Sequence, residues 1–168
     1  MQRPTLVAVD TNILLRLAGE DDSTIDAVEL LKRRLKPVQF LVPHTAMDEL
    51  MAKSAKDNHP FLSQLSLKAL RQLRSDWGFF PQVLNAVQEA IVNNAVLRLR
   101  DSGLLPYEER NDALVIAESA VLNCVLLVSK DSHLFDIDRE RLAFLFRQLD
   151  LPVPLIASPD DLIKKFYR

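Results

Sequence analysis

The sequence predicts an α/β three-layer sandwich, in which a central parallel β-sheet of four to five strands carries helices on both faces. Short apolar segments of three to five residues alternate with longer amphipathic segments along the whole chain. Continuous apolar strands are typical of parallel sheets, because helices cover both faces of such a sheet. No repeat, low-complexity tract or linker interrupts the 168 residues, so we expect a single domain over residues 1–168.

Three strands are expected in the first half of the chain. Residues 6–9, LVAV, form an apolar run that is too short for a helix. Residues 40–42, FLV, form a second run, which Pro43 ends. The aromatic segment at residues 77–80, WGFF, lies before Pro81, which favours a strand at the edge of the sheet.

Helices are expected between these strands. Ser23 with Asp26, and Thr45 with Asp48, have the spacing of a capping box, in which side chains satisfy the first backbone groups of a helix. In the segments over residues 61–74 and 82–101, apolar residues recur every four positions. Those of the second segment are Val83, Val87, Ile91 and Ala95. The helices are therefore expected over residues 23–36, 45–55, 61–74 and 82–101.

The second half of the chain continues the alternation. A stripe of small residues that includes Ala113, Ala117 and Ala120 suits a helix that packs closely on a sheet. Asp138 is placed to cap a following helix, and Ser158 to cap the last one. We expect helices over residues 108–122 and 138–148 and from residue 158, with strands over residues 124–128 and 153–156.

The composition excludes several classes of function. The three glycines are too far apart for a glycine-rich nucleotide-binding loop. The three histidines have no HExxH spacing, and the single Cys124 rules out a thiolate zinc cluster or a disulfide framework. Any catalysis must therefore depend on carboxylates.

The charge and hydropathy patterns bear on location and partners. No apolar run approaches a membrane span or a signal peptide, so we expect a cytoplasmic protein that has no membrane partner. With 21 basic and 23 acidic residues, the net charge of −2 gives no general attraction for nucleic acid. A nucleic-acid ligand would need a local basic patch or bound metal ions.

Four carboxylates are expected at one edge of the sheet. Asp10 ends the first strand, Asp131 follows the most apolar strand, and Glu49 and Asp112 lie in the first turns of helices. Asp136 is an alternative to Asp131 as the last acid. The carboxyl ends of parallel strands share one edge, where ligands bind in open α/β sheets. Cations would relieve the mutual repulsion, and such oxygen-rich sites suit Mg²⁺ or Mn²⁺.

Each of these acids also has a structural explanation. Asp10 could serve only as an N-cap or in an Asx turn, and Asp112 could serve only to stabilise a helix dipole. Asp48 competes with its neighbour Glu49. Because the capping box already explains Asp48, we prefer Glu49 as the functional acid.

Four segments carry the acids in a characteristic order and spacing: VAVDTNILLRL, DEL, RNDALVIAESAVL and CVLLVSKDSHL, which begin at residues 7, 48, 110 and 124. Together they resemble the PIN-domain ribonuclease family, and the resemblance covers nearly the whole chain. It implies a compact PIN-like α/β fold with a central parallel sheet. His133 and Leu134 depart from the family's pattern, in which an Asn or Asp is often followed by an aromatic residue, and so does the polar stretch at residues 53–59.

The resemblance also implies a site. The implied catalytic and metal-binding acids are Asp10, Glu49, Asp112 and Asp131. The implied supporting polar residues are Thr11, Asn12 and Ser129. Bound Mg²⁺ or Mn²⁺ would activate a water that hydrolyses the RNA phosphodiester, so no covalent nucleophile is needed.

The function implied by the resemblance is that of a metal-dependent endoribonuclease, in the role of the toxin of a bacterial or archaeal toxin–antitoxin pair. Its partners would be RNA, a small antitoxin protein and a second copy of the chain in a homodimer. Arg16, Lys53 and Lys56 are candidates for phosphate contacts. Solvated helix faces are the preferred explanation for the two lysines, whereas Arg16 is better placed because it lies shortly after Asp10.

Two alternatives remain at this point. The first is a PIN-fold module that binds RNA or protein without turnover. The second is a haloacid-dehalogenase-like phosphatase, which also places an Asp after its first strand. That enzyme needs a second Asp two residues later as acid and base, where this chain has Asn12.

Overall fold

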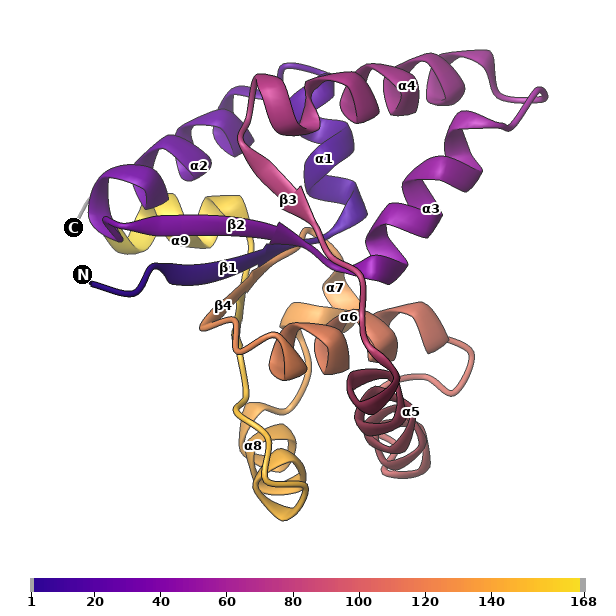
Figure 1. Cartoon of the computed structure of the whole chain (residues 1–168), viewed down its shortest axis with the longest axis vertical. Helices are drawn as coiled ribbons and strands as arrows, with labels where there is room; N and C mark the ends of the chain where they lie inside the picture. Colours follow the sequence, from indigo (N-terminus) through magenta and orange to yellow (C-terminus); the bar gives the residue numbers. More distant parts are fainter. Residues whose placement is uncertain (1, 167–168) are drawn as a thin grey trace.

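The computed structural model describes residues 2–166 and contains a five-stranded sheet (Figure 1). Its strands are β1 (Thr5–Val9), β2 (Val38–Val42), β3 (Phe79–Pro81), β4 (Leu126–Val128) and β5 (Leu155–Ala157). The order across the sheet is β3-β2-β1-β4-β5, and every neighbouring pair is parallel. The predicted parallel α/β class is therefore confirmed, and β3 lies at an edge of the sheet as expected.

Nine helices surround the sheet within the described residues. They are α1 (Thr11–Ala18), α2 (Asp22–Arg34), α3 (His44–Ser54), α4 (Pro60–Ser75), α5 (Ala86–Asp101), α6 (Arg110–Val121), α7 (Ser132–Phe135), α8 (Arg139–Gln148) and α9 (Pro159–Phe166). Helices α1, α2, α4 and α9 cover one face of the sheet, and α5, α6 and α8 cover the other (Figure 1). This arrangement confirms the three-layer sandwich.

The core lies in two halves on either side of the sheet, because successive strand residues point to opposite faces. In β1, Val7 and Val9 join the half formed with α1, α2 and α4, whereas Ala8 joins the half formed with α5 and α6. All three side chains are fully buried. Burial on both faces explains why the strands are continuously apolar rather than alternating.

Helices α1 and α7 are absent from the sequence prediction. Each begins directly after an acid that caps it: Asp10 accepts a hydrogen bond from the Thr11 amide (2.8 Å), and Asp131 accepts one from the His133 amide (2.9 Å). Only Asp10 separates β1 from α1, and α7 has just four residues. Helix α7 is too short to show a helical period. Helix α1 has one, since Ile13, Leu14, Leu17 and Ala18 are buried on one side, and the prediction overlooked it.

Both predicted capping boxes in the first half of the chain are wrong. Helix α2 begins at Asp22, and the carboxylate of Asp21 rather than Ser23 accepts a hydrogen bond from the Thr24 amide (3.1 Å). Helix α3 begins at His44, so Thr45 lies inside the helix. In contrast, Ser158 caps α9 as predicted, since its hydroxyl accepts from the Asp161 amide (3.2 Å).

A carboxylate from α6 supplies the missing cap of α3. The Glu118 side chain is 2% exposed and accepts hydrogen bonds from the Thr45 amide (3.1 Å) and the Thr45 hydroxyl (2.6 Å). Burial raises the pKa of Glu118, and the two bonds from Thr45 oppose that rise. The pair joins α3 to α6 across 73 residues of sequence.

Replacing Glu118 with alanine is expected to lower the free energy of unfolding by about 2–4 kcal/mol, because two buried donors of Thr45 would lose their acceptor. Urea denaturation at neutral pH measures the change. The matched control is Glu140→Ala, which removes an exposed glutamate from the first turn of α8 and should change stability by about 0.5 kcal/mol or less. Equal effects of the two variants would contradict the prediction.

Helix α5 also differs from its prediction. It begins at Ala86 rather than residue 82, because Asn85 and Gln88 form a capping box. The residues of the predicted stripe that precede Ala95 are exposed, and the buried side instead carries Val92, Ala95, Val96 and Leu99. Val87 and Ile91 line a shallow groove with Leu149 and Leu151. The homodimer implied by the resemblance stays a prediction, and this side of α5 is available to it.

The helices have no membrane-spanning character in the part of the chain that the structure describes. The longest, α4 and α5, have 16 residues each. None of those described is both long enough and apolar enough to cross a bilayer.

Candidate metal centre

The sheet places Asp10 and Ser129 next to each other at its carboxyl edge. Val9 of β1 lies opposite Val128 of β4, so the residue after each strand reaches the same position. The Asp10 amide donates to the Val128 carbonyl (3.1 Å), and the Ser129 hydroxyl donates to Asp10 Oδ2 (2.8 Å). Asp10 is 5% exposed and Ser129 is fully buried. The register of two strands therefore sets the first carboxylate of the site.

Asn12 and Ser129 hold the loops that carry the acids. Asn12 Nδ2 donates to Asp10 Oδ2 (3.2 Å) and to Ser129 Oγ (3.1 Å), and Asn12 Oδ1 accepts from the Lys130 amide (2.9 Å). Ser129 Oγ also accepts from the Asp131 amide (3.0 Å). Two of the three predicted supporting residues, Asn12 and Ser129, thus connect Asp10 to the segment that bears Asp131.

Burial raises the pKa of Asp10 to about 6. The hydrogen bonds from Ser129 and the Thr11 amide lower this pKa, whereas the charges of Glu49 and Asp131 raise it further. A metal-free Asp10 is therefore partly protonated near pH 6.

Glu49 faces the same edge from α3. Its Oε2 accepts a hydrogen bond from the Thr11 hydroxyl (2.8 Å), which also donates to the Ala46 carbonyl (3.2 Å). The neighbouring Asp48 pairs with His44 on the surface (3.3 Å), where 56% of the Asp48 side chain is exposed. Between the two adjacent acids, only Glu49 contacts the group around Asp10.

Asp112 lies in the first turn of α6 and is 9% exposed. Its Oδ2 is the one buried side-chain nitrogen or oxygen without a hydrogen-bond partner in residues 2–166. Burial raises its pKa to about 7, and the charges of Asp131, Asp10 and Glu109 add to that rise. The charge of His133 opposes it. An ionised Asp112 is therefore poorly stabilised in the protein without a cation.

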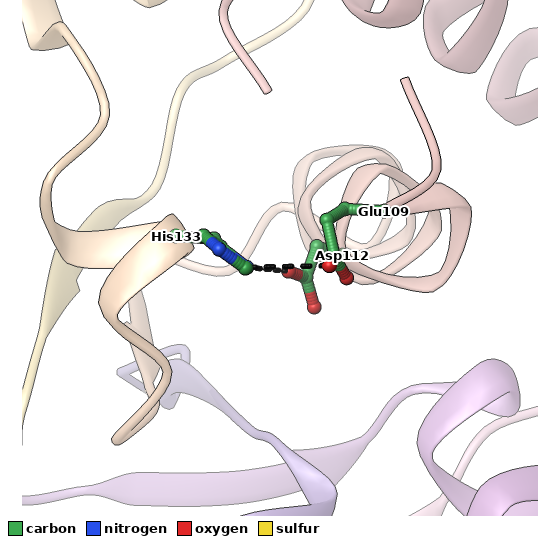
Figure 2. Close-up of side chains that lie close together, drawn as sticks. All are labelled: Glu109, Asp112 and His133. Atoms are coloured by element: carbon green, nitrogen blue, oxygen red, sulfur yellow. Dashed lines mark ion pairs between the residues drawn. The ribbon is translucent and has the colours of Figure 1, made fainter. Parts of the chain in front are cut away.

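Two further groups lie in the centre and were missed by sequence reasoning. His133 Nδ1 lies 3.5 Å from Glu109 Oε1, 3.7 Å from Asp112 Oδ2 and 3.5 Å from Asp131 Oδ1. Figure 2 shows the His133 ring pointing toward the carboxylates of Glu109 and Asp112. Two sequence signals existed: Glu109 precedes Asp112 by one helical turn, and His133 follows Asp131 by two residues.

The other predicted residues lie further from these contacts. Asp136 is exposed at the end of α7, and among the described residues no side-chain hydrogen bond or ion pair joins it to the acids above. Arg16, one turn beyond Asn12 in α1, pairs with Asp21 (3.4 Å). Lys53 lies one turn beyond Glu49 in the last turn of α3, and Lys56 follows that helix in an exposed position.

The donor set fits a hard divalent cation. Carboxylates from four separate segments converge, and one buried carboxylate oxygen lacks a partner. Mg²⁺ and Mn²⁺ take such oxygen ligands. The charge of Asp131 raises the pKa of both Asp10 and Asp112, and the charge of Asp10 raises that of Asp112.

Comparisons with known proteins show what the fold is similar to. No protein-family model matches the chain, and no curated protein matches it. The chain is similar to one in the crystal structure of VapBC2 from Rickettsia felis bound to a DNA fragment from their promoter, with a TM-score of 0.63 and 17% sequence identity. The similarity covers 92% of this chain and 98% of the other. At this identity, the similarity shows a shared fold.

Proposed function

We propose, from its PIN-like fold and its carboxylate centre, that the chain is an endoribonuclease that depends on Mg²⁺ or Mn²⁺. The observation that carries the proposal is the Asp112 Oδ2 atom, which is buried without a hydrogen-bond partner among the other carboxylates. A purely structural acid would be expected to have a partner. A bound cation would give the Asp112 Oδ2 atom the interaction partner that the protein does not supply.

The residues of the centre divide into ligands and supports. Asp10, Asp112 and Asp131 would hold the ion, and Glu49 would hold a second ion or orient the attacking water. When bound, the ion lowers the pKa of a water molecule and neutralises the charge that develops on the phosphate. Ser129 fixes the Asp10 carboxylate through its hydroxyl hydrogen bond.

RNA is the proposed substrate, and its backbone charge makes binding dependent on the metal. Without a cation, the clustered carboxylates repel phosphate. The proposed phosphate contacts are Arg16 on α1, Lys53 on α3 and Lys56, which follows α3. Replacing any one of them should lower the salt dependence of RNA binding.

We extend the proposal to the role of a toxin with a small antitoxin protein as its partner. The sequence resemblance implies that role, and the similar structure is that of VapBC2. The chain lacks the second acid that the phosphatase alternative requires, because Asn12 occupies that position and its side-chain amide is hydrogen-bonded to Asp10, Ser129 and the Lys130 amide.

The test is cleavage of a pool of structured and single-stranded RNAs by purified protein with Mn²⁺, with Mg²⁺ and with a chelator. Cleavage should require the metal and disappear in Asp10→Asn. The matched control is Asp48→Asn, which changes an exposed acid of the same type and should cleave like the parent protein. If the protein cuts no RNA and also binds no Mn²⁺, the non-catalytic binding module replaces the nuclease, whereas Mn²⁺ binding without cutting indicates that the specific substrate is absent from the pool.

Ser129→Ala is expected to lower Mn²⁺ affinity by roughly 10- to 100-fold, because the groups that orient metal ligands have effects of that size. The variant removes the hydroxyl that donates to Asp10 and accepts from the Asp131 amide. Calorimetric titration of Mn²⁺ measures the loss. Ser132→Ala, three residues away at an exposed position, is the control and should bind normally. Similar affinities for the two variants would argue against the role of Ser129.

A further inference from the structure

We propose that His133 is a metal ligand of this centre and that its imidazole makes the centre prefer Mn²⁺ to Mg²⁺. The inference rests on the metal dependence in the proposed function and adds a nitrogen donor to the implied carboxylates. It assigns a role to the residue at which the chain departs from the family's pattern.

The geometry supports one cation between α6 and α7. Glu109, Asp112 and His133 each offer one ligand atom, and these three atoms all lie within 4.8 Å of one another. Two ligand atoms of a single ion can be separated by at most twice the metal–ligand distance, which is roughly 4 to 5 Å for common divalent ions. The three donors therefore lie close enough to share one ion (Figure 2).

A second, independent observation points to a ligand at this place. Asp112 is 9% exposed, and its Oδ2 atom has no hydrogen-bond donor. The same atom faces His133 Nδ1 at 3.7 Å, which is too long for a hydrogen bond. A cation between the oxygen and the nitrogen satisfies both atoms.

The imidazole determines which ion is preferred. Mg²⁺ is held by carboxylates, phosphates and water. Imidazole suits Fe, Ni, Cu and Zn best, and Mn²⁺ is the weakest-binding member of that first-row series, to which Mg²⁺ does not belong. Replacing one oxygen donor by a nitrogen donor therefore favours Mn²⁺ relative to Mg²⁺. The competing role for His133 is that of a protonated counter-ion to Glu109, Asp112 and Asp131. In that role its imidazole would not coordinate the metal.

The first experiment detects the nitrogen directly. Mn²⁺ is bound to the RNA-free protein, and electron spin-echo spectroscopy is used to look for modulation by a coordinated ¹⁴N nucleus. The parent protein and His59→Asn should both show the imidazole signal, since His59 lies exposed at the start of α4. His133→Asn should lose it. A bound ion without the signal in the parent protein, or an unchanged signal in His133→Asn, overturns the proposal.

The second experiment measures selectivity. The ratio of Mn²⁺ to Mg²⁺ affinity, from calorimetric titrations, should fall about tenfold or more in His133→Asp, which makes the donor set all oxygen. Thermal unfolding verifies that the variant folds, as expected for a side chain that is 44% exposed. An unchanged ratio overturns the proposal, and so does a parent protein that binds no Mn²⁺.

The two proposals fail in different ways. Metal-dependent RNA cleavage without the ¹⁴N signal supports the nuclease and shows that His133 is not a metal ligand. Conversely, the ¹⁴N signal in a protein that cuts no RNA establishes the ligand without supporting the nuclease.

Discussion

Asp112→Asn is expected to stabilise the metal-free protein at pH 8 and to abolish metal-dependent RNA cleavage. The stabilisation arises because burial, together with the smaller effect of the charges of Asp131, Asp10 and Glu109, raises the pKa of Asp112 from 3.8 to about 7. Since one pKa unit corresponds to about 1.4 kcal/mol, ionisation at pH 8 costs the folded state a few kcal/mol. A neutral amide avoids that cost, so we expect a gain of about 2 kcal/mol.

The same substitution removes an implied ligand of the catalytic ion. Cleavage should fall by about a hundredfold or more, because the ion supplies most of the charge stabilisation. The combination of higher stability with lower activity is typical of a functional site and not of a structural acid. Asp112 would then be retained for its chemistry at the expense of stability.

Chemical denaturation at pH 8 with a chelator, together with the RNA cleavage assay, tests both halves of this prediction. Asp26→Asn on the exposed side of α2 is the matched control and should alter neither property. A less stable Asp112→Asn protein would indicate that the acid has a structural role, since the charged form would then be favoured by the fold.

The second large effect is a loss of stability of the metal-free protein as the pH rises from about 4 to 8. Asp10 and Asp112 both have pKa values above the ordinary value of 3.8, at about 6 and about 7. Between pH 4 and these values the folded state binds more protons than the unfolded state, so the free energy of unfolding falls as the pH increases. The combined loss should be on the order of 4 kcal/mol.

Mn²⁺ should reverse this trend, because it binds the ionised carboxylates of the folded protein. At a hundred times its dissociation constant, a ligand adds about 2.7 kcal/mol to the stability of the folded state. Urea denaturation at several pH values, with Mn²⁺ and with chelator, measures both effects. The double variant Asp10→Asn with Asp112→Asn is the control and should show a flatter pH profile without response to the metal. A parent protein that is most stable at pH 8 without metal would refute the prediction.

Local sequence patterns predicted much of the fold. The parallel sheet, its covering helices and the caps at Asp138 and Ser158 were correctly predicted, and the PIN-like fold implied by the motifs is confirmed. These features depend on burial periodicity and on side chains that act within three or four residues, so a single stretch of sequence contains the necessary information. The predicted caps of α2 and α3 were wrong. The cap of α2 is Asp21, two residues before the predicted Ser23, and the cap of α3 is Glu118, which comes from another helix.

The sequence by itself determined which acids end or follow the strands, and the rule for parallel sheets then placed Asp10 and Asp131 at one edge. Only the tertiary structure decided that Glu49 and not Asp48 contacts this group, and that Glu109 and His133 lie within it. The physical reason is the range of the interactions. Strand burial is encoded in neighbouring residues, whereas the distances between carboxylates depend on how α3, α6 and α7 pack, which segments far apart in the chain determine together.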